Sequence, residues 1–316
     1  MNREIEHICE LYIDNRNNFK YKNLLYEGTM LNVAALLCAY DDYPITKEEV
    51  QLYKKMLKEN TGVFSAYRNN MLCPMIAKMA MTDDPYAYLK EIQDIALQLE
   101  DTKVFKSEYS VIAAMIIYEN NDPSRKREFI SKTKIIYQIM KNEHSFLTDS
   151  SDIVFAALLA TSDIDSNNLL LEMDECFLLL KEKYKSYYKQ ELSHILALNL
   201  GSPGEKVEKF MSIFTLYKAY GLKVSKMYNI LMVGLISLLE VDDEILIQDI
   251  IEVDQYLKVQ KGFHGLSMDS TERLIYAISI VTMYYSHDSI VNKSVLMYVL
   301  LRIAIERQAA AAAAAA

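Results

Sequence analysis

The sequence predicts an all-α protein built from about seven stacked two-helix repeats, each about 40 residues long. Such repeats form either an open α-solenoid or a closed α/α superhelix or ring, and both arrangements fit the sequence. Three observations predict this class. Glycine and proline are scarce, a short apolar pattern recurs at a regular interval, and a polar turn follows each copy of the pattern.

The chain of 316 residues contains only 8 glycines and 5 prolines, whereas average usage gives roughly 22 and 16 at this length. Both residues interrupt helices and mark hairpins and loops, so their scarcity predicts long helices with short connections. With 51% hydrophobic and 24% charged residues, the chain has the composition of a globular protein that buries a sizeable core.

The recurring pattern places apolar residues around one small residue inside a helical stretch. Consecutive small residues are 42, 37, 43, 40, 37 and 43 positions apart. A small side chain lets two helices approach closely, and a single helix pair cannot bury its apolar stripe alone, so neighbouring pairs are expected to stack. These anchor residues are Ala35, Ala77, Ala114, Ala157, Ala197, Gly234 and Ala277.

A turn rich in Asp, Asn or Ser follows each anchor, and in several copies this residue stands directly before Pro. That order is typical of an N-cap followed by Pro in the first helical position. A second helix with apolar residues at helical spacing is expected after each turn, for example over 86–100, 129–140 and 207–220. The turns lie at 41–44, 82–85, 120–123, 161–163, 201–204, 241–243 and 286–288.

We expect one helical-repeat domain over residues 1–308. The last eight residues, 309–316, are all alanine, and this tail is left out of the functional interpretation. The last repeat is more apolar than a solvent-facing end repeat should be, so either the tail covers it or it docks on another molecule, such as a second copy of the chain. Its apolar residues include Tyr284, Tyr285, Val295, Leu296, Tyr298 and Leu301.

The net charge of −9 and the pI near 5.2 argue against nucleic acid as a partner, because duplex binding needs a basic face. The apolar run 230–239 is too short to span a membrane, and residues 1–7 lack the apolar core of a signal peptide. The four cysteines, Cys9, Cys38, Cys73 and Cys176, form no C-x-x-C motif. A reducing, cytoplasmic location is therefore expected.

The segment 146–160, FLTDSSDIVFAALLA, resembles a stretch typical of the bacterial family known as domain of unknown function 4003. The total length and the final alanines are also similar, so the resemblance covers nearly the whole chain. Asp149 stands where the family usually has Gly. The resemblance implies no activity or site residue. In physical terms the polar opening 148–152 is an N-cap, in which Asp149 or Ser150 accepts hydrogen bonds from free helix N–H groups.

The sequence contains no P-loop, G-x-G-x-x-G, H-E-x-x-H or G-x-S-x-G motif. Two Glu-x-x-His pairs, Glu4 with His7 and Glu191 with His194, place both side chains on one helix face, as in carboxylate-bridged di-metal bundles. His194 is close to the Ala197 anchor, however, where a buried core histidine is the more common occurrence. We therefore assign no catalytic residue, cofactor-binding residue, metal ligand or cofactor.

The acidic pairs Asp83-Asp84 and Asp242-Asp243 resemble metal-binding carboxylates, but they stand just before predicted helices, where carboxylates complement the helix dipole. We interpret them as caps. Two clusters mix basic and aromatic residues, as single-strand binders do, but lysines near helix ends are usually solvated and contribute their stems to packing. We favour the solvated interpretation for both clusters, which are 181–189 and the group Arg16, Phe19, Lys20, Tyr21 and Lys22.

The leading functional hypothesis is a non-enzymatic helical-repeat scaffold that binds a protein or peptide, because extended repeat surfaces serve this purpose. Abundant tyrosine (23, with no Trp) suits partner recognition. One alternative is an enzyme on a closed α/α ring that uses carboxylates from the turns, and another is a homodimerising structural protein. A pocket lined by Asp, Glu, His and Tyr from three or more repeats favours the enzyme, whereas an extended apolar surface favours the scaffold.

Overall fold

The computed structural model describes residues 1–20, 28–63, 65–100, 108–120, 122–143, 148–162, 166–183, 188–198, 201–223, 228–265, 267–286 and 290–315. These residues form fifteen α-helices and two short 3₁₀ helices and contain no β-strand, which confirms the predicted all-α class. In chain order the helices are α1 (Arg3–Phe19), α2 (Gly28–Tyr40), α3 (Lys47–Asn60), η1 (Ala66–Arg68), α4 (Leu72–Ala80), α5 (Pro85–Glu100), α6 (Glu108–Glu119), η2 (Pro123–Arg125), α7 (Lys126–Glu143), α8 (Asp152–Thr161), α9 (Ser166–Lys183), α10 (Lys189–Ala197), α11 (Pro203–Ala219), α12 (Tyr228–Ile236), α13 (Asp243–Lys258), α14 (Ser270–Tyr285) and α15 (Ile290–Ala315).

Two kinds of helix alternate along the chain. Helices α2, α4, α6, α8, α10, α12 and α14 are buried over most of their described length, and each contains one anchor. The intervening helices α3, α5, α7, α9, α11 and α13 bury one stripe and expose the opposite face. A helix that is apolar all round must lie inside a protein, whereas an amphipathic one lies at its surface. Each of the first six anchors thus lies in a buried helix that is followed by a surface helix. Whether these pairs form an open solenoid or a closed ring stays a prediction.

Helix α5 shows how the sequence produces a surface helix. Pro85 opens it, and the Asp84 carboxylate accepts a hydrogen bond from the Ala87 N–H at 2.9 Å. Its buried stripe begins at Tyr88 and continues through Ile92, Ile95 and Leu99. The predicted helix over 86–100 is therefore confirmed, as are those over 129–140 and 207–220.

Helix α3 shows another way to begin a surface helix. It starts at Lys47 with Thr46 as its N-cap. The Thr46 side chain accepts from the Glu49 N–H at 3.2 Å, and the Glu49 carboxylate accepts from the Thr46 N–H at 2.8 Å. This reciprocal capping box satisfies two backbone N–H groups at the start of the helix.

The contacts within the chain divide it into two compact units. Unit 1 consists of Met1–Cys9 and Ile164–Val299, and unit 2 consists of Glu10–Asp163 and Leu300–Ala316. The boundary therefore falls within α1 and again within α15. The predicted single domain over 1–308 stays a prediction, and each unit is described here by itself.

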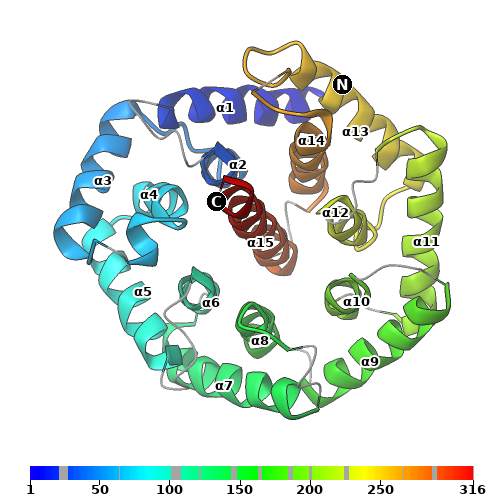
Figure 1. The fold of residues 1–316 in the computed structure, drawn as a ribbon, viewed down its shortest axis with the longest axis horizontal. Coiled ribbons are helices and arrows are strands. Elements are labelled where there is room, and N and C mark those ends of the chain that lie inside the picture. Colours follow the sequence, from blue (N-terminus) through cyan, green and yellow to red (C-terminus); the bar gives the residue numbers. More distant parts are fainter. Residues whose placement is uncertain are drawn as a thin grey trace. The chain divides into compact units, whose positions relative to one another are not determined.

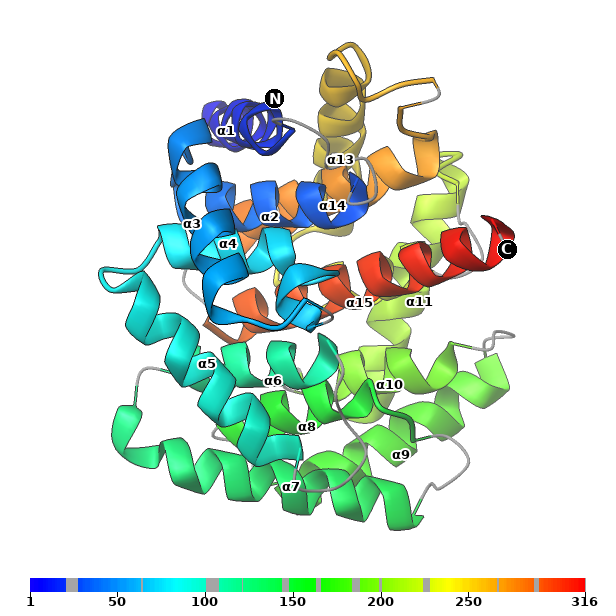
Figure 2. The ribbon, with the colours of Figure 1, turned by 60° about the vertical axis from the view of Figure 1, so that its left-hand side comes forward.

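In unit 2, each surface helix packs on the buried helix that follows it in sequence, namely α3 on α4, α5 on α6 and α7 on α8. Helices of the same kind also contact each other, as α2 does with α4, α6 with α8 and α5 with α7. Figure 1 shows α4, α6 and α8 on the inner side of α3, α5 and α7, and Figure 2 shows α5 and α7 running alongside α6 and α8. The result is two layers of helices with the core between them.

Unit 1 repeats this two-layer packing. The buried helices α10, α12 and α14 contact one another in order, and so do the surface helices α9, α11 and α13. Gly234 in α12 shows why an anchor must be small. A Cβ atom at this position would lie only 2.5 Å from Cδ1 of Leu192 in α10. The close approach predicted for the anchors is thus confirmed at this one.

Helix α15 departs from the alternation because it is buried where a surface helix is expected. Every described side chain from Val295 to Ile305 is less than a tenth exposed. Residues 309–315 of the alanine tail continue the same helix. The apolar side chains of α15 are therefore buried, whereas Tyr284 and Tyr285 of the same repeat are half-buried. Docking of this repeat on another molecule, such as a second copy of the chain, stays a prediction.

Candidate binding site

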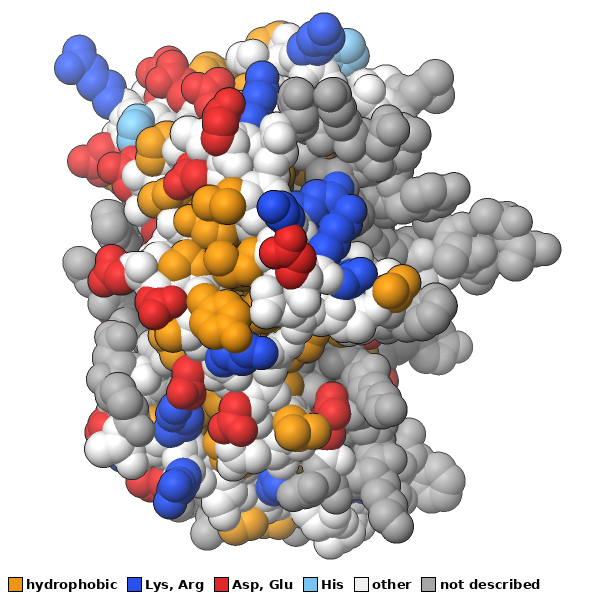
Figure 3. Space-filling model, turned by 90° about the vertical axis from the view of Figure 1, so that its left-hand side faces the viewer, with side chains coloured by type: hydrophobic (Ala, Val, Ile, Leu, Met, Phe, Trp, Pro, Cys, Tyr) orange, Lys and Arg blue, Asp and Glu red, His pale blue; other side chains and the backbone are white. Residues whose placement is uncertain are grey.

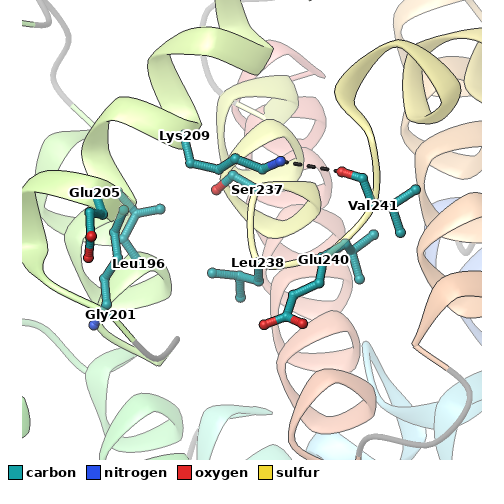
Figure 4. A pocket seen from close by; sticks show the side chains of 10 residues that line it. Leu196, Gly201, Glu205, Lys209, Ser237, Leu238, Glu240 and Val241 are labelled. Atoms are coloured by element: carbon teal, nitrogen blue, oxygen red, sulfur yellow. Dashed lines mark hydrogen bonds between the residues drawn. The ribbon is translucent and has the colours of Figure 1, made fainter.

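A pocket of about 280 Å³ lies in unit 1 where the turns α10–α11 and α12–α13 meet (Figure 4). Its position follows from the fold, because α10 and α12 end here while α11 and α13 begin here. Small-molecule pockets have volumes of about 300–1,000 Å³, so this one suits a small ligand. The pocket is lined by Leu196, Gly201, Glu205, Lys206, Lys209, Ser237, Leu238, Leu239, Glu240 and Val241.

The floor of the pocket is apolar. Leu196 is the penultimate residue of α10, and Leu238 and Leu239 follow the end of α12; all three are less than a tenth exposed. The Ser237 hydroxyl donates a hydrogen bond to the Gly234 carbonyl at 2.7 Å, so it is satisfied within its own helix. The floor therefore offers contact area rather than hydrogen bonds.

Two lysines of α11 form one wall, and each has an acidic partner. Lys206 is only 4% exposed and forms an ion pair with Glu172 of α9. The Lys209 ammonium contacts the Asp243 carboxylate at 2.5 Å and donates to the Val241 carbonyl at 3.3 Å. A buried ammonium group needs such partners, and here they hold α11 to the surface helices on either side of it.

Two carboxylates line the pocket on the side away from the Lys209 ammonium. In Figure 4 the carboxylates of Glu205 and Glu240 flank Leu238, while the Lys209 ammonium points to Val241. One oxygen of Glu205 accepts from the Ser202 N–H at 2.9 Å and from the Ser202 hydroxyl at 2.8 Å. These hydrogen bonds from Ser202 hold the pKa of the Glu205 carboxyl below its ordinary value. Glu205 is therefore an anion at neutral pH.

Unit 2 contains a counterpart of this region at α4, α5 and α6, where a buried ion pair and an aromatic ring occur. The Lys78 ammonium at the end of α4 forms an ion pair with the Glu119 carboxylate of α6 at 2.9 Å, and Lys78 is only 7% exposed. Burial alone lowers the pKa of Lys78, but Glu119 and Asp41 outweigh it and raise that pKa above its ordinary value. Lys78 is therefore a fixed cation and does not serve as a nucleophile.

Tyr88 of α5 completes this counterpart. It is only 3% exposed, and its ring meets the Tyr118 ring edge to face at 4.9 Å between centroids. Burial raises the pKa of the Tyr88 phenol well above its ordinary value. Its hydroxyl has no hydrogen-bond partner among the described residues.

The structure places the two Glu-x-x-His pairs in different surroundings. Glu4 and His7 are exposed on α1, whereas His194 is fully buried in α10. Within the described ranges, no three side chains of His, Cys, Asp or Glu come close enough to hold a metal ion. His194 is thus a core residue, as expected for its place beside the anchor.

Three of the four turn carboxylates in the acidic pairs have a described role. Asp84 caps α5, and Asp242 caps α13 by accepting from the Glu244 and Ile245 N–H groups at 2.9 and 3.2 Å. The capping interpretation is confirmed for these two. Asp243 binds Lys209 and, at 2.9 Å, the Ser212 hydroxyl of α11, so it links neighbouring surface helices.

The solvated interpretation holds for only one of the basic-aromatic clusters. Lys181 and Lys183 are exposed at the end of α9, and Lys183 lies 3.4 Å from Glu208; residues 184–187 lie outside the described residues. In the other cluster the interpretation is wrong for two members. Phe19 is fully buried, and Arg16 is buried with its Nε donating to the Asn32 side chain at 2.6 Å. Tyr21 and Lys22 are not among the described residues.

The opening of α8 lacks the predicted side-chain cap, since its N-cap residue is Ser151 and the Ser151 side chain accepts no hydrogen bond from the helix. Asp149 accepts from the N–H and hydroxyl of Ser151 at 2.7 and 2.6 Å, and the Asp152 carboxylate accepts from the Asp149 N–H at 2.8 Å. The Asp149 side chain therefore shapes the turn before α8, which begins at Asp152. The prediction that Asp149 caps the helix is wrong, because its hydrogen-bond donors belong to the residue before the helix.

The four cysteines are buried and unbridged. Burial raises the pKa of Cys176 to about 11 and raises that of Cys38 as well. A thiol with a raised pKa is a poor nucleophile. These residues therefore act as small apolar side chains.

Lys78 and Lys206 were not singled out from the sequence, although both leave a signal there. Lys78 directly follows the Ala77 anchor within an otherwise apolar run. Lys206 stands at the first position of a stripe that continues with Phe210, Ile213 and Tyr217. A charged residue at a core position predicts a buried ion pair, because an isolated charge there is too costly.

The fold and the pocket define an all-helical protein of paired helices with room for a small ligand. The chain belongs to the family described as "Protein of unknown function (DUF4003)", whose sequence model matches residues 11–310. This confirms the resemblance of the segment 146–160. The chain is also similar to "Uncharacterized protein YeaA" of Bacillus subtilis (strain 168), at 21% identity over 325 residues that cover all of this chain and 94% of the relative. No solved structure matches the chain.

A search of the described helices for membrane spans finds none with both the length and the apolar character that crossing a bilayer requires.

Proposed function

We propose that this protein is a non-enzymatic interaction scaffold that binds a basic, apolar segment of another protein. The observation that carries the proposal is a group of apolar and aromatic side chains on α3 and α5 in unit 2, here called the α3–α5 surface. It consists of Leu52, Tyr53, Met56 and Tyr86.

The side chains of the α3–α5 surface are at least partly exposed. Leu52 is 54% and Tyr86 49% exposed, and Tyr53 and Met56 are half-buried. Figure 3 shows hydrophobic side chains gathered on the face formed by these helices. Single exposed apolar residues are normal, but a gathered group supports a binding role. Tyrosine adds rigid contact area at low entropic cost.

The charge around this surface favours a basic partner. Four exposed aspartates, Asp41, Asp42, Asp83 and Asp84, occupy the turns that precede α3 and α5, and Figure 3 shows carboxylates along one side of the hydrophobic group. The Lys90 ammonium lies 5.4 Å from the centroid of the Tyr86 ring. The ring face of Tyr86 therefore already has a cation from its own helix, so the preference for a basic partner rests on the aspartates. Opposite charges across an interface add specificity and speed association.

The partner is therefore a polypeptide whose apolar side chains are flanked by Lys or Arg. Nucleic acid and membrane lipid are disfavoured because the chain carries a net charge of −9. The proposal places the protein in the cytoplasm, which four unbridged cysteines support. The enzyme alternative requires a pocket lined by residues from three or more repeats, whereas the described lining of the pocket at the α10–α11 and α12–α13 turns comes from two helix pairs.

A peptide-display selection tests the proposal. The wild-type protein is the bait, and the double variant Leu52→Ser, Tyr86→Ser is used for counter-selection. Both side chains are about half exposed, so the double variant should fold as the wild type does. The matched control is Leu178→Ser, which removes a 58% exposed leucine from α9 in unit 1.

We expect enriched peptides that combine apolar residues with Lys or Arg. Their affinity should fall by about tenfold or more in the double variant, since exposed anchor residues at interfaces contribute more than about 1 kcal/mol each. The control should bind as the wild type does. Enriched peptides that are acidic, or that bind the double variant equally well, contradict the proposal, as does a selection that enriches nothing. Self-association lost in the double variant would instead identify a second copy of the chain as the occupant.

A further inference from the structure

The pocket between the α10–α11 and α12–α13 turns has a function separate from the α3–α5 surface, and its polar groups identify the chemistry of its ligand. The lysines in its wall do not attract an anion, because each is already neutralised. Lys206 pairs with Glu172, and Lys209 pairs with Asp243 while also donating to the Val241 carbonyl. An anionic ligand would have to displace one of these carboxylates.

The carboxylates on the other side differ in this respect. Among the described residues, neither Glu205 nor Glu240 has a Lys or Arg partner. Within the described ranges, one oxygen of Glu205 accepts from Ser202, a neutral donor, and no donor is seen on the other oxygen. Glu240 is exposed and lines the pocket beside Leu238 and Val241. The pocket and its immediate partners therefore contain four carboxylates against two ammonium groups, which leaves an excess of negative charge.

The helix ends add to this negative potential. Helices α10 and α12 end at Ala197 and Ile236, next to pocket residues, and the last carbonyls of a helix favour cations. Helix α11 begins here too, but its first turn is already capped. The Ser202 hydroxyl accepts from the Glu205 N–H at 3.4 Å, which reduces the attraction of this helix end for an anion.

We propose that this pocket binds a primary ammonium group carried on a short apolar stem. The ammonium group lies between the carboxylates of Glu205 and Glu240, and the stem lies on Leu196, Leu238 and Leu239. The volume of about 280 Å³ limits the ligand to a small amine. Water is displaced from the leucines, while the three N–H donors of the ammonium group find charged acceptors.

Titration with n-butylammonium tests the proposal, with binding measured by isothermal calorimetry and by ligand-observed NMR. Butyrate, which has the same stem with the opposite charge, is the matched probe. The variant Glu240→Gln removes one carboxylate charge from the pocket. The control Glu208→Gln removes a 73% exposed carboxylate from α11, outside the pocket lining. A second variant, Leu238→Asn, makes the floor polar.

We expect the wild type and Glu208→Gln to bind butylammonium equally and butyrate not at all. Binding of butylammonium should weaken by about tenfold in Glu240→Gln, since a charge-assisted hydrogen bond is lost. Leu238→Asn should also weaken binding of butylammonium, and it should weaken binding of methylammonium, used as a probe without a long stem, by less. Butyrate binding, equal affinity of Glu240→Gln and the wild type, or absence of butylammonium binding would each overturn the proposal. None of these outcomes bears on the α3–α5 surface, which the peptide selection tests separately.

Discussion

The pocket in unit 1 and the Lys78 region in unit 2 occupy the same place in their helix pairs, but different side chains line them. Tyr88 and Lys206 each stand three residues after the proline that opens their helix, and each begins the buried stripe. In unit 2 the aromatic ring at this position packs beside a buried ion pair that links α4 to α6. In unit 1 the lysine turns to α9 instead, and the space beside it stays open.

This difference teaches that the same position in a helix pair can hold an aromatic ring in one unit and an ion-paired lysine beside a pocket in the other. The buried helices differ accordingly. Gly234 brings α12 close to Leu192 of α10, whereas a lysine and a glutamate bridge α4 and α6. Four pairs of substitutions break or sharpen this comparison.

The largest effect is expected for Lys78→Met, which leaves the Glu119 carboxylate without its cation in unit 2. Breaking a buried ion pair by removing one partner costs about 3–5 kcal/mol. Urea unfolding followed by circular dichroism measures the change. The control Lys55→Met removes an ammonium that is 75% exposed and lies 3.8 Å from Glu59, and it should cost under about 0.5 kcal/mol. Equal losses for both would show that burial of the pair is unimportant.

Gly234→Ala tests the close approach of α10 and α12 in unit 1. The added Cβ would meet Leu192, which is fully buried and therefore has little room to move. Overpacking costs about 1–3 kcal/mol, partly offset by about 1 kcal/mol of helix propensity, so we expect a net loss of about 1–2 kcal/mol in thermal or urea unfolding.

The control for this substitution is Gly204→Ala in α11, where an added Cβ meets nothing within 4 Å. It should stabilise the protein by about 0.5–1 kcal/mol. If both glycine variants gain stability, the small anchor does not determine the spacing of the two helices.

Two N-cap substitutions compare the units directly. Ser202→Ala removes the cap of α11 beside the pocket, and Asp84→Ala removes the cap of α5 in unit 2. Each should lose about 1 kcal/mol of unfolding free energy. Only Ser202→Ala should also weaken butylammonium binding, because Ser202 holds the Glu205 carboxylate. Equal affinity of both variants for butylammonium would show that the Ser202 cap does not contribute to ligand binding in the pocket.

The smallest effect is expected for Tyr88→Phe. Its hydroxyl is buried with no partner among the described residues, so removing it should leave stability unchanged or raise it by up to about 1 kcal/mol. Tyr217→Phe is the matched variant in unit 1, where the hydroxyl accepts from Asn229 at 3.2 Å. That variant should lose about 1 kcal/mol. A large loss at Tyr88 would reveal a partner for its hydroxyl.

The sequence predicts the helices well because their causes are local. Anchors such as Ala77 and Gly234 fall in buried helices, and Asp84 and Asp242 cap the helices that follow them. Local capping also determines the start of α3, where Thr46 and Glu49 form a capping box. Spacing and caps depend on residues within one or two turns.

The candidate sites were harder to predict because their partners are distant in sequence. Arg16 resembles a solvated basic residue until the fold supplies Asn32. Lys206 stands in an apolar stripe, but the sequence does not show that its partner is Glu172 of α9. The pocket itself is formed by two turns about 40 residues apart in sequence, and no short sequence motif predicts that these turns lie side by side.

The ion pairs between neighbouring surface helices have a consequence for how the chain tolerates insertions. Lys126 pairs with Glu91, Lys206 with Glu172 and Lys209 with Asp243, at separations of 34 or 35 residues. One residue inserted inside a helix rotates everything after it by about 100° and turns a lysine away from its partner. The same residue inserted in a turn leaves these partners facing each other. Length variation between relatives should therefore accumulate in the connections, which also absorb the range of 37 to 43 residues between anchors.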